Sequence, residues 1–189
     1  MHAEPLPFDV SELQDQGEGR SHGIHQGECI RRIMRTLDPA RYGAEEALDP
    51  NLLELGFIWE EVLSRALSQR FKGRRQVEVL HKGIWRTLDG FDTDAWAVLE
   101  SKATKISAAN AITSARFYGW QLQTAGYCGA ADTDTAVLKA LFINGAYEKA
   151  KFGAPLAKGW RLQFTEREIQ EAEAMIQNAA EEIAEEKVR

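Results

Sequence analysis

Three side chains near the middle of the sequence could do chemistry together. Glu100 and Lys102 lie at the end of an apolar segment that reads as a β-strand, and Asp89 ends the strand before it. Because side chains alternate across a strand, Glu100 and Lys102 share one face and Ser101 lies on the other. A twist or bulge in the hairpin would bring Asp89 to the same end of the sheet.

Two carboxylates that converge in this way would form a hard oxygen site for a divalent cation. Mg²⁺ and Mn²⁺ prefer carboxylate, carbonyl and water ligands. A lysine beside such a site can polarise an attacking water and offset the negative charge of a phosphate. The alternative is an exposed strand end that carries an ordinary Glu–Lys ion pair.

Two further groups of polar residues lie on predicted helices. Gln123 and Tyr127 are four residues apart, so they share one helix face and can reach a common site; the alternative is a partly buried helix face. Glu60 lies on the predicted helix before the strands and could contribute a carboxylate to the same site, as could the neighbouring Glu61. The alternative is that Glu60 is a solvated carboxylate on the helix surface.

These residues together resemble the PD-(D/E)XK nuclease superfamily. Asp89 and the triplet 100–102 are separated as in its motif, with ten residues between Asp89 and Glu100 and with Leu88 in place of the motif's proline. The segment GFIWE at 56–60 is similar to a helix motif of RecB-type and lambda-exonuclease-like (YqaJ-like) nucleases. Residues 123–127 are similar to the QxxxY motif of that branch.

The resemblance implies a metal-dependent DNA nuclease, in this branch an exonuclease of DNA recombination, repair or replication, and a phage-encoded one. It implies Mg²⁺ or Mn²⁺ as the cofactor and DNA as the partner, and also a homo-oligomer and a single-strand-annealing or other recombination partner protein. An endonuclease of the restriction or junction-resolving type and a non-catalytic DNA-binding protein share the fold and remain alternatives. A hydrolase of small phosphate esters is a third.

The resemblance also gives each residue a role. Lys102 would position the attacking water, while Gln123 and Tyr127 would order this lysine or contact DNA. The metal ligands would be two carboxylates, a backbone carbonyl and a helix carboxylate: Asp89, Glu100, Ser101 and Glu60.

The net charge of the whole sequence argues against a nucleic-acid partner, but the distribution of charge along the sequence does not. The formal charge is −6 over 189 residues, but residues 1–60 carry −7 and residues 166–189 carry −5, whereas 61–105 and 106–165 carry +3 each. The acidic C-terminal helix is expected to be a solvated face. The basic middle predicts contacts with the DNA backbone, unless it is a solvated helix end, and its candidates are Arg65, Arg70, Lys72, Arg74, Arg75 and Lys105.

Hydrophobic periodicity predicts an α/β (α+β) protein. The order helix, three strands, helix, strand over about residues 51–144 resembles the restriction-endonuclease-like core of the PD-(D/E)XK superfamily. Flanking helices complete a single domain from 24 to 189, after an irregular arm at 1–23. A capping box of Thr165 and Glu168 opens the last helix. The expected elements are helices at 24–37, 51–69 and 108–128, a three-strand meander at 77–79, 84–86 and 96–99, and strands at 137–143 and 160–164.

The remaining candidates have ordinary interpretations. Asp92 is expected to shape a turn, His25 to be a surface histidine rather than a metal neighbour, and the five tryptophans to belong mostly to the core. Cys29 and Cys128 read as small buried hydrophobes, and two cysteines indicate a reduced, cytoplasmic setting. No apolar run approaches the length of a membrane span, so no membrane partner is expected.

Overall fold

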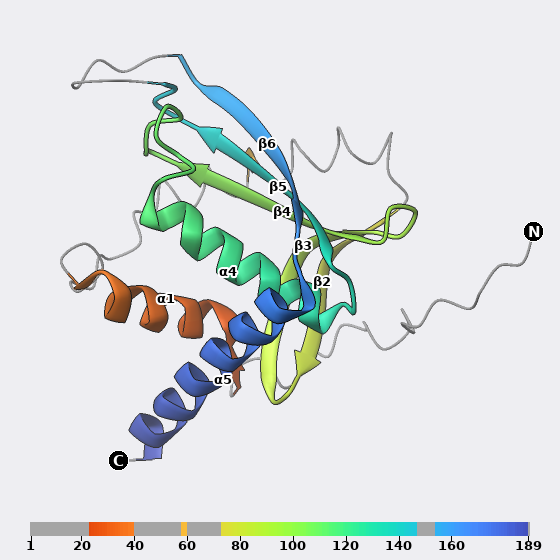
Figure 1. Ribbon diagram of the computed structural model, residues 1–189, viewed down its shortest axis with the longest axis vertical. Coiled ribbons are helices and arrows are strands. Elements are labelled where there is room, and N and C mark those ends of the chain that lie inside the picture. Colours follow the sequence, from red (N-terminus) through yellow and green to blue (C-terminus); the bar gives the residue numbers. More distant parts are fainter. Residues whose placement is uncertain (1–22, 40–57, 60–72, 147–153, 189) are drawn as a thin grey trace, which may run out of the picture.

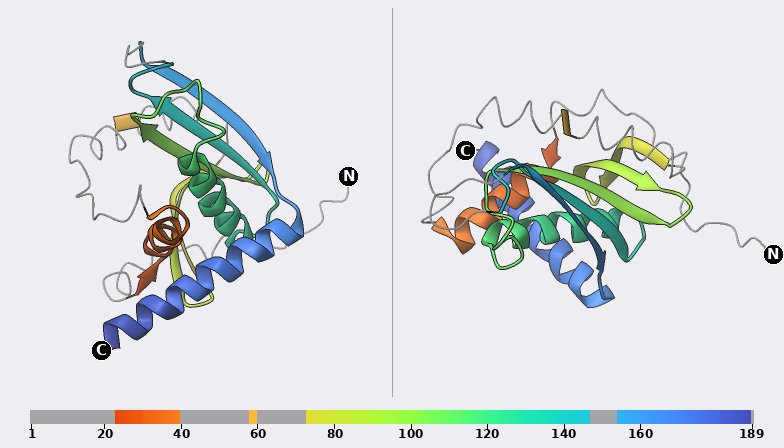
Figure 2. Two further views of the ribbon diagram at one scale, coloured as in Figure 1. Left: turned by 60° about the vertical axis from the view of Figure 1, so that its left-hand side comes forward. Right: turned by 90° about the horizontal axis from the view of Figure 1, so that it is seen from above.

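A computed structural model of the chain describes residues 23–39, 58–59, 73–146 and 154–188 (Figure 1). This part contains a six-stranded mixed sheet and three long helices, which lie on the same side of the sheet (Figure 2). In chain order the elements are β1 (Ile24–His25), α1 (Gln26–Leu37), β2 (Gly73–His81), β3 (Ile84–Asp92), β4 (Ala97–Thr104), α4 (Ala115–Ala130), β5 (Thr135–Phe142), β6 (Leu156–Gln163) and α5 (Glu166–Val188).

The sheet has the order β1-β3-β4-β5-β6, with β2 paired to β3. Strands β2, β3 and β4 are antiparallel neighbours, which confirms the predicted meander. The chain then crosses through α4 to β5, which pairs parallel with β4, and β6 closes the sheet as an antiparallel edge strand. This connection places α4 against β4 and β5.

The pairing of strand β3 with its neighbours is interrupted at Asp89. Its first half pairs with β1 and with the second half of β2, while its last three residues pair with β4 from Gly90↔Leu99 onward. The β2 ladder also omits the pair opposite Asp89, where Gln76 has a φ of 49°, in the left-handed region. Asp89 therefore lies where regular pairing breaks on both edges of its strand.

Alternation along the strands fixes which side chains face α4. In β5 every second residue from Ala136 to Phe142 is buried, and the residues between them are half-buried. In β4 the residues in register with this buried set are Val98, Glu100, Lys102 and Thr104. The chemically interesting side chains of β4 consequently point to the layer occupied by α4.

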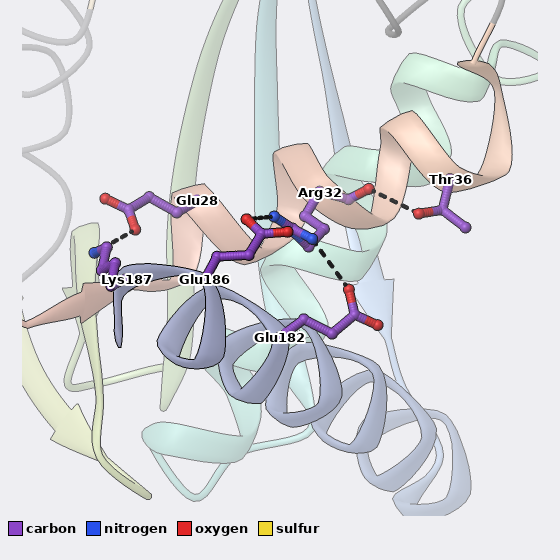
Figure 3. Close-up of polar contacts among 6 residues, drawn as sticks. All are labelled: Glu28, Arg32, Thr36, Glu182, Glu186 and Lys187. Carbon is purple, nitrogen blue, oxygen red and sulfur yellow. Dashed lines mark hydrogen bonds and ion pairs between the residues drawn. The ribbon is translucent and has the colours of Figure 1, made fainter. Parts of the chain in front are cut away.

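Helix α1 packs on α5 through an apolar seam with ion pairs at its exposed margin (Figure 3). Arg32 of α1 contacts Glu182 at 3.3 Å and also Glu186, and Lys187 lies 3.5 Å from Glu28. Exposed pairs of this kind contribute little to stability, so the buried apolar side chains dominate this contact. Glu182 and Glu186 thus have a structural contact with α1.

Most element predictions hold, with shifts at their ends. The first helix begins at Gln26 because residues 24 and 25 pair with β3, and the helix expected from 108 begins only at Ala115. Ser114 caps it by accepting the N–H of Phe117, while the Ser, Asn and Thr residues before it form turns. The strand expected at 160–164 extends back to Leu156, and the Thr165–Glu168 capping box is present.

Some predictions lie outside the described residues. They are the N-terminal arm except Gly23, and the helix at 51–69 except Ile58 and Trp59, which are helical. In the described part of the chain, no helix is long and apolar enough to cross a bilayer.

Candidate active site

Glu100 and Lys102 form an ion pair on the α4-facing side of β4. The side chain of Glu100 is 1% exposed, whereas that of Lys102 is 21% exposed. The two residues are two positions apart on a strand, so alternation alone brings them to one face. A buried carboxylate is expensive to desolvate, and the neighbouring ammonium offsets that cost while remaining open to solvent.

The side chain of Asp89 lies beside this ion pair because the pairing of β3 with its neighbours is interrupted at this residue. Its Oδ2 accepts the backbone N–H of Ser101 at 2.7 Å. The carboxylate thereby occupies the place that the next rung of the β3–β4 ladder would take after Gly90↔Leu99. The N–H and C=O of an extended residue lie on the same edge of a strand, so the Ser101 carbonyl also faces the Asp89 side.

Helix α4 adds Gln123 and Tyr127 from one face, one turn apart. Lys102 Nζ donates to Gln123 Oε1 at 3.0 Å, and Gln123 Nε2 donates to the Tyr127 hydroxyl at 2.7 Å. An ammonium has only donors, so the amide oxygen must face Lys102 and the amide nitrogen is directed to Tyr127. A continuous polar chain runs from Glu100 through Lys102 and Gln123 to Tyr127.

The electrostatics of this chain keep Tyr127 neutral. Burial raises the pKa of Tyr127 well above its ordinary value, and the negative charges of Glu100 and Asp89 raise it further. The hydrogen bond from Gln123 acts in the opposite direction but does not compensate. Tyr127 is consequently a protonated phenol at neutral pH, suited to hold the Gln123 amide in place.

The donor set around Asp89 fits a hard divalent cation. It offers two carboxylates and the Ser101 carbonyl, and hard cations such as Mg²⁺ bind one or two protein carboxylates and complete their shell with water. Among the described residues, His, Cys, Asp and Glu side chains do not gather in threes or more where they could hold a metal ion. The oxygen-only chemistry of these three groups favours Mg²⁺ or Mn²⁺ over Zn²⁺.

The structure therefore brings together Asp89, Glu100, Ser101, Lys102, Gln123 and Tyr127. Of the other predicted residues, Glu60 and its competitor Glu61, Arg65, Arg70 and Lys72 lie outside the described residues. The backbones of Arg74 and Arg75 belong to β2, where Arg75 pairs with Gly90 beside Asp89. Lys105 is exposed just beyond the end of β4.

Asp92 and the two cysteines behave as their ordinary interpretations predict. Asp92 Oδ1 accepts the N–H groups of Asp94 and Ala95 at 3.0 Å each, which confirms its role in a turn. His25 lies in β1, paired with Trp85. Burial raises the pKa of the Cys29 thiol to about 11 and that of Cys128 to about 12, so both stay protonated and neither is an activated nucleophile.

Sequence reasoning overlooked two buried polar residues that contact α4 from other elements. Gln26 donates to the Gln123 carbonyl, and Arg86 contacts both the Gly126 carbonyl and Glu173. A signal was available for each. Arg86 alternates with the buried Ile84 and Leu88 on one strand face, and Gln26 begins the helix face that continues with Cys29, Ile30 and Ile33.

No protein-family model and no curated protein matches the sequence. Solved structures do match, among them the protein SSO0001, with 13% identity, a TM-score of 0.53 and coverage of 92% of this chain and 87% of that chain. A phage-related exonuclease from Haemophilus somnus 129PT matches with 11% identity and a TM-score of 0.54, over 90% of this chain and 100% of that chain.

LHK-Exo, an alkaline exonuclease from Laribacter hongkongensis solved in complex with dAMP, matches with 11% identity and a TM-score of 0.53. The alignment covers 87% of this chain and 89% of that chain. This chain shares their fold. The predicted α/β class is confirmed, and at such low identity the likeness establishes architecture alone.

Proposed function

We propose that this protein is a metal-dependent deoxyribonuclease, and more narrowly an exonuclease. The observation that carries the proposal is the convergence of Asp89, Glu100 and Lys102 at one place on the sheet, with Gln123 hydrogen-bonded to the lysine. Two solved structures of the same fold are exonucleases, and one of them contains the nucleotide dAMP. A site of two carboxylates and a lysine suits hydrolysis of a phosphodiester.

In this proposal Asp89, Glu100 and the Ser101 carbonyl hold the cation, together with Glu60. Bound Mg²⁺ or Mn²⁺ would supply Lewis acidity toward the scissile phosphate and lower the pKa of a water molecule.

The remaining groups orient the reactants. Lys102 directs the attacking water through its ammonium hydrogens and offsets negative charge that develops on the phosphate. Gln123 fixes the direction of the Lys102 side chain by accepting from its Nζ, and Tyr127 fixes the Gln123 amide in turn. Orientation of this kind lowers the barrier by removing unproductive geometries before the reaction begins.

DNA would be held by cations near this site. Arg74 and Arg75 belong to the strand that flanks β3 at the level of Asp89, and Lys105 follows the strand that carries Lys102. Arg65, Arg70 and Lys72 are the further candidates. Contacts of lysine and arginine with phosphates release counterions, so we expect affinity for DNA to fall steeply as salt increases.

An exonuclease requires a DNA end, whereas an endonuclease does not. We favour the exonuclease, acting in recombination, repair or replication and encoded by a phage, on the motif resemblance and on the exonucleases that share the fold. End-labelled linear DNA should give a ladder of end-dependent products with Mg²⁺, and closed circles should remain intact. Cleavage of closed circles would overturn the exonuclease assignment and leave the endonuclease.

The catalytic assignment has its own test. Lys102→Ala and Glu100→Gln should retain the far-ultraviolet circular dichroism of the wild type and lose cleavage by about a hundredfold to a thousandfold. Lys187→Ala, at an exposed position near the C-terminus, is the matched control and should cleave normally. Full activity in either site variant would rule out the proposed site.

A further inference from the structure

Gln26 is a buried amide that joins α1 to the functional turn of α4. It is 1% exposed, although it is the first residue of a helix. Its Nε2 donates to the backbone carbonyl of Gln123 at 2.7 Å, across 97 residues of sequence. The residue that receives this bond is the one whose side chain contacts Lys102.

The bond from Gln26 reaches a carbonyl inside a regular helix. In an α-helix the carbonyl of Gln123 is the acceptor for the N–H of Tyr127, so Gln26 is a second donor to that oxygen. The amide nitrogen of this deeply buried side chain is hydrogen-bonded, whereas its Oε1 has no hydrogen-bond partner among the described residues. Gln26 thus forms a hydrogen bond with the backbone of the α4 turn that carries both Gln123 and Tyr127.

Gly126 makes this approach possible. A Cβ atom at Gly126 would lie 2.9 Å from Gln26 Oε1 and 2.5 Å from Ile176 Cδ1, both closer than side chains tolerate. The Gly126 carbonyl in turn accepts from Arg86 Nη1, which is paired with Glu173. Two buried polar side chains from different elements therefore contact carbonyls three residues apart in α4.

We propose that Gln26 is a positioning residue for Lys102 and acts through Gln123. This inference rests on the proposed nuclease function, because Lys102 is given its role there. Gln26 itself does not contact the lysine. It sets the position of the Gln123 backbone, and through it the amide oxygen that receives the Lys102 ammonium. A displaced amide would misdirect the lysine without altering how DNA is held.

The test replaces Gln26 by methionine, which has a similar length and flexibility but no donor. We expect kcat on linear DNA with Mg²⁺ to fall about tenfold, since one hydrogen bond of roughly 1.4 kcal/mol is lost from the alignment of the site. KM should change less than about twofold. Arg32→Ala, on the exposed side of the same helix, removes the contacts of Arg32 with α5 and should leave kcat unchanged.

A double-mutant cycle separates positioning from a general loss of structure. Once Gln123→Ala has removed the amide, Gln26→Met should cause no further loss of kcat, because the two side chains act in series. Independent, multiplicative losses would overturn the proposal, and so would a wild-type kcat in Gln26→Met. If the methionine variant does not fold, Gln26→Asn carries the same cycle, since its shorter amide falls short of the Gln123 carbonyl.

Failure of this inference is distinguishable from failure of the proposed function. If wild-type protein cleaves DNA and Lys102→Ala does not, the nuclease site stands whatever Gln26→Met does. If wild-type protein does not cleave DNA with Mg²⁺ or Mn²⁺, the proposed function fails, and the role of Gln26 falls with it.

Discussion

Two ion pairs lie against α4 and differ in what surrounds them. Arg86 and Glu173 are sealed, with side chains 0% and 8% exposed, and join β3 to α5. Glu100 and Lys102 lie within one strand, and Lys102 is 21% exposed. The sealed pair contacts the α4 backbone at Gly126, whereas the open pair contacts a side chain, Gln123. The first arrangement holds the fold, and the second leaves a cation partly open to solvent.

The groups around Glu173 and Glu100 explain why the two ion pairs differ. Burial raises the pKa of Glu173, but hydrogen bonds from His81 and Arg86 and the charge of Arg86 lower it to about 2. Lys82 lies 3.2 Å from the same carboxylate. Glu173 is therefore surrounded by cationic and donor groups from one hairpin. Glu100 is paired with Lys102 of its own strand, and the negative charges of both Glu100 and Asp89 act on Tyr127.

The largest expected effect comes from the open site. Asp89→Asn keeps the shape of the side chain and removes its charge, so cation binding should fail and cleavage should fall about a hundredfold to a thousandfold. The melting temperature should change little. Asp94→Asn, an exposed position in the same hairpin, is the control. Cleavage at the wild-type rate by Asp89→Asn would remove this residue from the site.

The opposite result is expected at the sealed pair. Glu173→Gln leaves Arg86 buried without its counter-charge, which should lower the free energy of unfolding by about 3 kcal/mol. Activity per folded molecule should persist. Glu171→Gln, exposed on the same helix, is the matched control and should be nearly neutral. A variant of wild-type stability would show that the pair does not hold β3 against α5.

The same carboxylate predicts how stability depends on acid. The pKa of Glu173 is about 2 in the folded protein against an ordinary 4.5, so its contribution is complete above 4.5. It is lost as the pH falls from about 4.5 toward about 2, because the unfolded chain then binds a proton that the folded chain does not. Urea titrations of wild type and Glu173→Gln should converge over this range. Parallel curves would contradict the assignment.

A smaller effect is expected at the end of the polar chain. Tyr127→Phe removes the acceptor of the Gln123 amide, so Gln123 holds Lys102 less firmly and kcat should fall about tenfold. Tyr118→Phe lies on the same helix, is exposed and serves as the control. Equal kcat values for the two variants would exclude Tyr127 from the alignment of Lys102.

The parts of the site that depend on local periodicity could be predicted from the sequence. Strand alternation brings Glu100 and Lys102 together, and helical spacing brings Gln123 and Tyr127 together. The contact of Asp89 with the Ser101 N–H was not predictable, because it requires the interruption of the ladder opposite Gln76. That interruption is set by three strands acting together rather than by any local pattern.

The overlooked contacts are tertiary. Gln26 and Gln123 are 97 residues apart, and Arg86 and Glu173 are 87 residues apart. The sequence pattern indicates that Arg86 and Gln26 are polar residues on apolar faces. It does not indicate which groups form hydrogen bonds with them. The late start of α4 has a local cause, since Ser107 and Thr113 form hydrogen bonds with nearby backbone groups and compete with the helix.

The most direct test of the account is digestion of end-labelled linear double-stranded DNA by wild type and Lys102→Ala, with Mg²⁺ and with EDTA in place of the metal. We predict that wild-type protein shortens the DNA from its ends only when Mg²⁺ is present, and that Lys102→Ala, folded to the same extent, leaves it intact. Equal digestion by both proteins, or undiminished digestion in EDTA, would contradict a metal-dependent nuclease site built on Asp89, Glu100 and Lys102.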